Sequence, residues 1–127
     1  MTFLITGAGR GLGLEFTQQL LTGKKNVVAW ARSPEKSTEL QKLAKDFPSQ
    51  LSIQKVDVAD FGSISEAAAK ISGSVDVLIN NAGVFLDGSK GFADLDMQTV
   101  KNTFDVNVYA PMMVAQAVLP LLQKSAD

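Results

Sequence analysis

The sequence contains no cysteine and no histidine among its 127 residues. The missing cysteine excludes disulfides, thiol nucleophiles and thiolate metal sites, and the missing histidine removes the commonest general base and metal ligand. An excess of one charge is also missing: 12 basic residues face 13 acidic ones, so no global field favours nucleic acid or an anionic membrane. We therefore expect no metal site and no nucleic-acid partner.

A basic leader and a long hydrophobic run are absent as well. The start, MTFLITGAGR, has only a very short apolar run, so we expect no signal peptide. We see no run long enough to span a membrane, and so expect no membrane partner and a cytoplasmic protein. The length of 127 residues suits one domain, and 46% hydrophobic with 20% charged residues is an ordinary globular balance.

Short apolar runs alternate with amphipathic stretches along the sequence. The predicted strands are residues 2–6, 26–30, 51–58 and 75–80. The predicted helices are residues 13–23, 34–47, 63–71 and 96 to about 124. We expect Ser63 and Glu66 to open the third helix as a capping box, Pro111 to bend the fourth, and residues 83–95 to form a loop. This alternation predicts a Rossmann-type, doubly wound α/β fold, with a parallel sheet in the order 3-2-1-4 and helices on both faces.

Residues 6–13, TGAGRGLG, place glycines at alternate positions directly after the first predicted strand. Glycine is costly to order, so either the chain turns sharply there or something approaches its backbone closely. A helix N-terminus offers free amides and partial positive charge, and a phosphate fits there if no Cβ keeps it away. The fingerprint G-x-G-x-x-G fails at Leu12, and the lysine of a P-loop is missing. The spacing that matches is T-G-x-x-x-G-x-G, carried by Thr6, Gly7, Gly11 and Gly13.

This spacing resembles the cofactor loop of the short-chain dehydrogenase/reductase family, and three further motifs support the resemblance. DVAD at 57–60 follows the third strand, NNAG at 80–83 ends the fourth, and DVNVYAP at 105–111 contains Asn107. The stretches ITGAGRGLGLEF, ARSPEK and AVLPLLQKSA are most similar to C-factor and sniffer-type carbonyl reductases. The resemblance covers the whole chain. It implies hydride transfer between a nicotinamide and a small-molecule carbonyl compound or alcohol.

The resemblance also implies roles for individual residues. It assigns cofactor contacts to the glycine loop, to an Asp-Val pair against the adenine, and to three residues beside the ribose. These residues are Gly7, Gly11, Leu12, Gly13, Asp57, Val58, Asn81, Ala82 and Gly83. Asn80 would hold the sheet by side-chain hydrogen bonds, and Asn107 would be the catalytic position, with a backbone kink and a water site in a proton relay. Taken singly, the same residues are more typical of a tight turn, a loop carboxylate and a solvent-facing helix side chain.

The end of the second strand, AWARS, bears on the choice of cofactor. It has no acidic residue of the kind that holds the ribose 2′-hydroxyl of NAD. Arg32 stands where it could pair bidentately with a 2′-phosphate, Arg10 could approach the same phosphate from the glycine loop, and Ser33 could add a hydroxyl donor. The sequence therefore predicts NADP(H). The alternative is two solvated arginines at the rim.

The tyrosine and lysine that the family arranges as Tyr-x-x-x-Lys are not matched. The single tyrosine is Tyr109, and Met113 lies four residues on. The chain stops at Asp127, before the strand that should end in the family's serine, so we expect residues 1–127 to be the cofactor-binding half of a reductase, inactive alone. Its open fourth strand and apolar last helix favour a homo-oligomer. The alternative is a catalytically silent nucleotide-binding fragment, which a purified mass near 13.5 kDa would favour.

Overall fold

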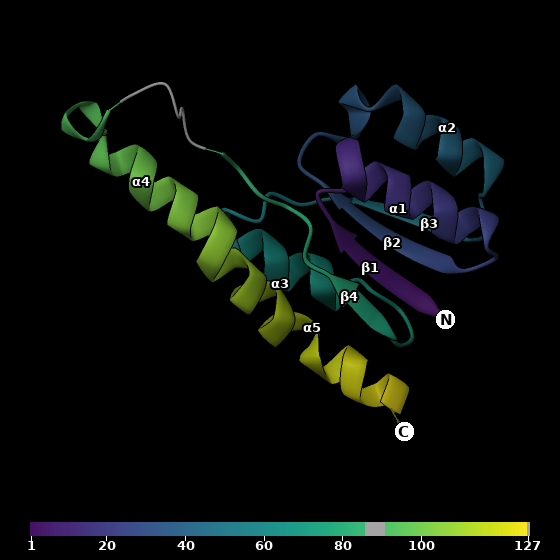
Figure 1. Cartoon of the computed structure of the whole chain (residues 1–127). Coiled ribbons are helices and arrows are strands. Elements are labelled where there is room, and N and C mark those ends of the chain that lie inside the picture. The colour runs from purple at the N-terminus through teal and green to yellow at the C-terminus, as the bar shows by residue number, and fades with distance from the viewer. Residues whose placement is uncertain (86–90, 127) are drawn as a thin grey trace.

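The computed structural model describes residues 1–85 and 91–126, in which four strands alternate with helices (Figure 1). The strands are β1 (Thr2–Thr6), β2 (Asn26–Ala31), β3 (Leu51–Lys55) and β4 (Val77–Ile79). They form one parallel sheet in the order β3-β2-β1-β4, which confirms the predicted topology. β3 and β4 are shorter than expected. The expected loop 83–95 includes residues 86–90, which lie outside the described residues.

Helices cover both faces of the sheet, and each face has its own apolar core. α1 (Gly11–Thr22) and α2 (Thr38–Asp46) cover one face, where Ile5, Leu21 and Leu40 are buried. α3 (Phe61–Ala69) and α5 (Ala110–Ala126) cover the other, around Trp30 and Val114. The parallel arrangement places the carboxyl ends of all four strands at one edge, which is where ligands bind in open α/β sheets.

The helix expected over residues 34–47 is in fact two elements. A 3₁₀ turn, η1 (Pro34–Lys36), is followed by Ser37 in an extended conformation, and α2 begins only at Thr38. The Ser37 hydroxyl accepts a hydrogen bond from the backbone N–H of Leu40 at 3.2 Å, as an N-cap does. A serine that caps the new helix therefore separates it from the turn begun by Pro34.

The expected capping box at the start of α3 is wrong. The helix begins at Phe61, and its N-cap is Asp60, whose carboxylate accepts hydrogen bonds from the backbone N–H groups of Gly62 and Ser63. The Ser63 hydroxyl instead donates to the backbone carbonyls of Asp57 and Asp60. Because the Asp60 carboxylate already accepts from the first backbone donors of α3, the Ser63 hydroxyl can instead bind the turn that precedes the helix.

The last predicted helix is continuous but irregular at its centre. α4 (Met97–Phe104) follows a 3₁₀ turn, η2 (Phe92–Asp94), and continues through a π-helical turn, η3 (Asp105–Tyr109), into α5. The sequence predicts a bend at Pro111, and the irregular turn lies just before that residue. Pro111 has no N–H to offer to the carbonyl of Asn107. The N–H of Ala110 donates to the carbonyl of Asp105, five residues earlier, as in a π-helix.

By length and composition this helical segment, Met97–Ala126, would be able to cross a membrane. By length and composition, therefore, the expectation that the chain has no segment able to span a membrane is wrong. Ala110, Val114 and Val118 are nevertheless buried against the sheet, which is the position of a core helix. Figure 1 shows that α4 extends beyond the sheet, and none of its residues is buried.

Candidate functional site

The glycine loop between β1 and α1 is held against the end of β4. The buried Thr6 hydroxyl accepts hydrogen bonds from the backbone N–H groups of Asn81 and Ala82, at 3.1 and 3.0 Å. Gly7 has φ +65°, and a Cβ there would lie 2.9 Å from the Ala82 Cα. A Cβ at Gly13 would lie 2.2 Å from the Gly7 carbonyl oxygen. Packing within the protein therefore requires glycine at positions 7 and 13. The Thr6 hydroxyl, for which the sequence predicted no role in the site, holds the loop against residues 81 and 82.

The other two glycines of the loop have different surroundings. A Cβ at Gly9 would make only ordinary contacts, the nearest at 3.5 Å. Gly11 has φ +55°, and a Cβ there would meet nothing within 4 Å, so its surroundings are open to a ligand. The side chain of Leu12, next in the chain, is 69% exposed.

The N-terminus of α1 itself is suited to an anion. Its N-cap residue, Arg10, makes no side-chain capping bond, and the first turn has no acidic residue. The amide of Leu14 donates to the Arg10 carbonyl, so the helical hydrogen bonds start there and the amides that precede Leu14 have no partner within the helix. These amides and the helix dipole fit the phosphates of a dinucleotide.

Two arginines lie on the rim of this edge. The N–H of Ala8 donates to the Trp30 carbonyl at 3.0 Å, which brings the glycine loop against the end of β2 and hence Arg10 to the same edge as Arg32. Both arginine side chains are exposed, and within the described ranges neither takes part in an ion pair. Ser33 is half-buried and precedes η1 without capping it. All three predicted phosphate contacts therefore remain available to a ligand.

The Asp-Val pair lies at the next strand end. The exposed Asp57 carboxylate accepts a hydrogen bond from the N–H of Ala59 at 3.0 Å, which fixes the turn after β3. The Val58 side chain is 9% exposed and belongs to the core cluster on the α3 face. A ligand would therefore meet the backbone of Val58, while its side chain holds the loop to the core.

The roles expected for the two asparagines of NNAG require a correction. Asn80 is exposed, and its side-chain amide donates to the Pro111 carbonyl at 3.3 Å, which links it to α5 and not to the sheet. Asn81 makes the side-chain bonds to the central strand, because its Nδ2 donates to the carbonyls of Thr6 and Gly7 at 3.2 and 3.1 Å. The predicted structural role thus belongs to the second asparagine, and sequence alone does not show which of two neighbours faces β1.

Asn107 lies in the π-helical turn and binds the extended segment that follows NNAG. Its Oδ1 accepts from the N–H of Val84 at 2.8 Å, and its Nδ2 donates to the Val84 carbonyl at 2.7 Å. A Cβ at Gly83 would come within 3.4 Å of the same Oδ1. Although exposed, the asparagine side chain is therefore engaged, and it couples the helix to residues 83–84. Tyr109, in the same turn, is 51% exposed.

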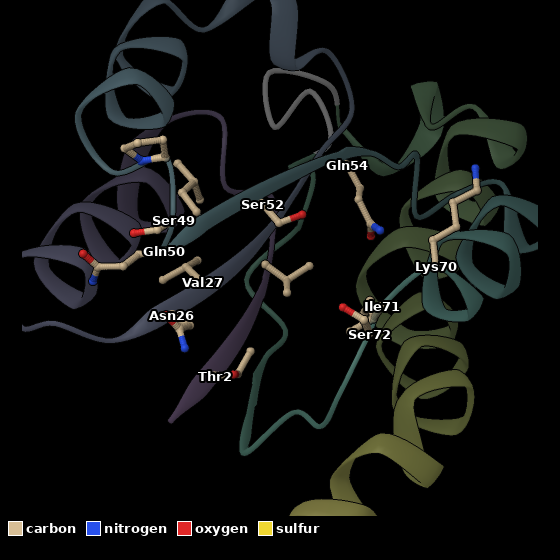
Figure 2. A pocket seen from close by; sticks show the side chains of 13 residues that line it. Thr2, Asn26, Val27, Ser49, Gln50, Ser52, Gln54, Lys70, Ile71 and Ser72 are labelled. Carbon is tan, nitrogen blue, oxygen red and sulfur yellow. The ribbon is translucent and has the colours of Figure 1, made fainter.

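A cavity formed by described residues lies away from the glycine loop. Its volume is about 320 Å³, and Figure 2 shows its lining side chains, among them Thr2, Asn26, Ser52 and Lys70. Thr2 and Asn26 begin their strands, so this cavity lies towards the opposite edge of the sheet from the glycine loop. In the same described residues, no group of three acidic, histidine or cysteine side chains could hold a metal ion.

Comparison with known proteins gives the same family for sequence and structure. The family model described as short chain dehydrogenase matches residues 1–127. The short chain dehydrogenase gsfK of Penicillium aethiopicum is 36% identical over 129 residues, which cover 98% of this chain and 51% of the relative. The chain spans about half the length of the curated relatives that it matches.

Two solved structures are similar over nearly the whole chain. A carbonyl reductase from Pseudomonas aeruginosa PAO1 has a TM-score of 0.88 and 29% identity, over 95% of this chain and 54% of that one. A short-chain dehydrogenase/reductase from Burkholderia multivorans with bound NADP has a TM-score of 0.84 and 27% identity, over 94% and 53%. With a family model that matches from the first residue to the last, the chain belongs to the short-chain dehydrogenase/reductase family.

Proposed function

We propose that this chain is the cofactor-binding half of an NADP(H)-dependent oxidoreductase that interconverts a small carbonyl compound and its alcohol. The observation that carries the proposal is the uncapped N-terminus of α1 beside Gly11, with Arg10 and Arg32 at the same edge. The NADP bound to one similar structure supports the cofactor, and the similarity to a carbonyl reductase supports the substrate class. A bound nicotinamide would supply the hydride, and the residues of this chain would hold the rest of the cofactor.

Each part of the cofactor would meet a different strand end. The pyrophosphate would lie on the first amides of α1, at Gly11 and Leu12. The adenine would lie beside Asp57 and the backbone of Val58, and a ribose would lie along Asn81–Gly83. The four parallel strands end at one edge, so these groups form a continuous row across β3, β2, β1 and β4.

The preference for NADP(H) would come from the rim arginines, with Ser33 as an additional donor. We expect Arg32→Asp to weaken NADPH binding by about tenfold or more, because a charge-assisted hydrogen bond contributes about 1.5–3 kcal/mol. Isothermal titration calorimetry with NADPH and NADH measures this. Lys70→Asp makes the same charge change at the distant cavity and should leave both affinities unchanged. Equal affinity of the unmutated chain for the two cofactors would refute the proposal.

The chain by itself should not reduce carbonyl compounds at a useful rate. Tyr109 has Met113 where the family has its lysine, so this tyrosine lacks the lysine partner with which the family donates the proton. Loss of general acid catalysis and of orientation at the nicotinamide lowers the rate by many orders of magnitude. NADPH oxidation with a reactive aldehyde or quinone tests this. Turnover by the 13.5 kDa chain that survives Tyr109→Phe would contradict it.

Asn107 would contribute to the activity of the complete enzyme. Its side chain holds both backbone groups of Val84, and Pro111 leaves the Asn107 carbonyl without the usual helical donor. That carbonyl would be the water site of a proton relay.

The second candidate function, a silent nucleotide-binding module, rests on the missing Tyr-x-x-x-Lys pair. It would share the cofactor preference and differ only in having no activity when joined to a second half.

A further inference from the structure

The segment between β2 and α2 reaches the surface for five residues and is anchored at both ends. Ala31, which ends β2, is 3% exposed, and Ser37, which caps α2, is 7% exposed. Between them, residues 32–36 are all exposed or half-buried. A short segment fixed in this way presents its side chains to solvent and to other proteins.

The glycine loop packs against both anchors of this segment. A Cβ at Gly9 would lie 3.5 Å from the Cβ of Ala31 and 3.9 Å from that of Ser37. Arg10, with its exposed side chain, follows Gly9 directly. The loop and the surface segment therefore lie side by side, with Arg10 on one of them and Arg32 on the other.

Ser33 lies in this surface segment, directly after Arg32, and its hydroxyl group has no structural task. It does not cap η1, and it makes no hydrogen bond within the described parts of the chain. The Ser37 hydroxyl, by contrast, accepts from the N–H of Leu40 and is needed to start α2. A group can therefore be attached to Ser33 without breaking a bond that holds the fold.

The sequence around Ser33, RSPEK, is typical of a protein kinase substrate. Ser33 stands directly before Pro34, and no other serine or threonine of the chain precedes a proline. An enzyme that offers no acceptor to the amide after its target serine selects proline, because proline has no N–H to leave unsatisfied. Proline-directed protein kinases select their substrates in this way. Lys36, three positions after the serine, adds a charge that an acidic group of such an enzyme can bind.

We propose that Ser33 is phosphorylated by a proline-directed protein kinase, and that this phosphate switches the cofactor preference of the chain from NADP(H) to NAD(H). In the reaction the Ser33 Oγ forms a bond to the γ-phosphorus of ATP. The bond from that phosphorus to the β-phosphate oxygen breaks, ADP leaves, and the hydroxyl proton is released. The inference rests on the proposed function, since it concerns the regulation of that same site.

The physical basis of the switch is competition for the rim arginines. A phosphoserine carries a charge of about −1.5 to −2 at pH 7 and three strong acceptor oxygens. Arg10 and Arg32 would bind it through charge-assisted hydrogen bonds and would no longer be available to the 2′-phosphate of NADP(H). The two phosphates would also repel each other.

The same modification would favour NAD(H). The end of β2, AWARS, has no acidic residue to accept a hydrogen bond from a ribose 2′-hydroxyl, which is the usual arrangement in NAD-binding proteins. A phosphate on Ser33 would bring the missing acceptor oxygens and negative charge to that strand end. Phosphorylation would thus exchange a rim that attracts a 2′-phosphate for one that attracts a 2′-hydroxyl.

Treatment of the chain with ATP and a purified proline-directed kinase tests the modification, and mass spectrometry of its peptides locates the phosphate. We expect Ser33 to be phosphorylated. Pro34→Ala is the matched control, because it keeps the Ser33 hydroxyl and the carbonyl that accepts from Ser37 and Gln41, but restores an N–H. It should not be modified. No phosphate on Ser33, or equal modification of both proteins, would overturn the proposal.

Calorimetry with NADPH and NADH tests the switch. The phosphorylated chain should bind NADPH tenfold or more weakly than the unmodified chain, because the second phosphate meets occupied arginines and a like charge. Its affinity for NADH should not fall. Kinase-treated Pro34→Ala should bind both cofactors as the unmodified chain does. Unchanged NADPH affinity after complete phosphorylation would overturn this inference and leave the proposed function intact.

Phosphorus NMR tests the inference without any cofactor. Pairing with the arginines should lower the second pKa of the phosphate on Ser33, because the two positive charges favour its doubly ionised form. The pKa should be higher in the phosphorylated double variant Arg10→Gln, Arg32→Gln. Equal pKa values in the two proteins would overturn the inference. Equal affinity of the unmodified chain for NADPH and NADH would instead refute the proposed function, so the two failures are distinguishable.

Discussion

The four glycines of the glycine loop have different structural roles, although they stand at regular alternate positions in the sequence. Gly13 has no room for a Cβ, since the nearest atom would be the Gly7 carbonyl oxygen at 2.2 Å. Gly11 has room but a positive φ. Gly9 has neither constraint, because its nearest contact would be at 3.5 Å. The consequence of adding one methyl group should therefore differ from position to position.

We expect Gly13→Ala to lower the free energy of unfolding by about 1–3 kcal/mol, because backbone must move to admit the methyl group. Gly11→Ala should cost about 1–2 kcal/mol through its left-handed conformation. On the function proposed above, it should also weaken NADPH binding, because the methyl group would enter the open space at Gly11 where we propose that the phosphates lie. Urea unfolding and calorimetry separate these effects. A Gly13→Ala protein as stable as the unmutated chain would show that the loop is looser than its contacts indicate.

At this scale the sequence predicts which residues form the loop but not how they share its functions. The spacing of TGAGRGLG identifies a strand, a turn and a helix start. Whether a glycine is needed by the protein or by a ligand depends on Asn81 and Ala82, which meet Gly7 only in the folded chain. The exchange of roles between Asn80 and Asn81 has the same cause, because both have the same side chain and differ in the element that each contacts, α5 for Asn80 and β1 for Asn81.

Among the elements, α3 offers a test of what starts a helix. Asp60→Ala should lower the free energy of unfolding by about 1 kcal/mol, because two backbone donors lose the carboxylate that caps them. Glu66→Ala, which would remove the capping box expected from the sequence, should change stability by less than about 0.5 kcal/mol, as is usual for an exposed side chain. Thermal and urea unfolding of the two variants decide between the two caps. A larger loss for Glu66→Ala would restore the capping box.

The order and type of the elements follow from the sequence, while their boundaries depend on local hydrogen bonds. The strands and the last helix are recognisable because their apolar residues repeat with the correct period. The break at Ser37 is harder to predict, since Pro34 could equally begin a longer helix. The sequence predicts a bend at Pro111, and the family resemblance implies a backbone kink at Asn107. The π-helical turn contains Asn107, because the turn before Pro111 adapts to the missing N–H.

At the scale of the whole molecule, one carboxylate joins the two ends of the chain. Asp76, just before β4, accepts hydrogen bonds from the Ser125 hydroxyl in α5 and, at 2.5 Å, from the backbone N–H of Thr2 in β1. These bonds, first from Ser125 and then from Thr2, lower the pKa of Asp76 below its ordinary value of 3.8. Sheet and last helix are therefore tied together by an ionised group.

A lowered pKa in the folded state means that the stabilisation is present above about pH 3.8 and is lost as the pH falls through the folded-state pKa. We expect Asp76→Asn to be less stable than the unmutated chain at pH 7, and this difference to shrink steadily below pH 4. Urea unfolding of both proteins at a series of pH values measures this difference. Taking the difference between the two proteins cancels the contribution of the other carboxylates, which they share. A difference that stays constant from pH 7 to pH 2 would exclude a role for the charge of Asp76.

The anchoring of the glycine loop has a consequence for how the chain folds. The Thr6 hydroxyl and the Gly7 carbonyl bind residues 81 and 82, so contacts that shape the start of the sequence come from far along it. Contacts of long sequence separation form slowly, and during synthesis the N-terminal residues emerge first. The residues of β1, β2 and β3 are therefore synthesised before residues 81 and 82, which anchor the loop. A nascent chain interrupted before residue 81 would carry the four glycines of the loop without the hydrogen bonds that join it to residues 81 and 82, so nucleotide binding should be acquired late in folding.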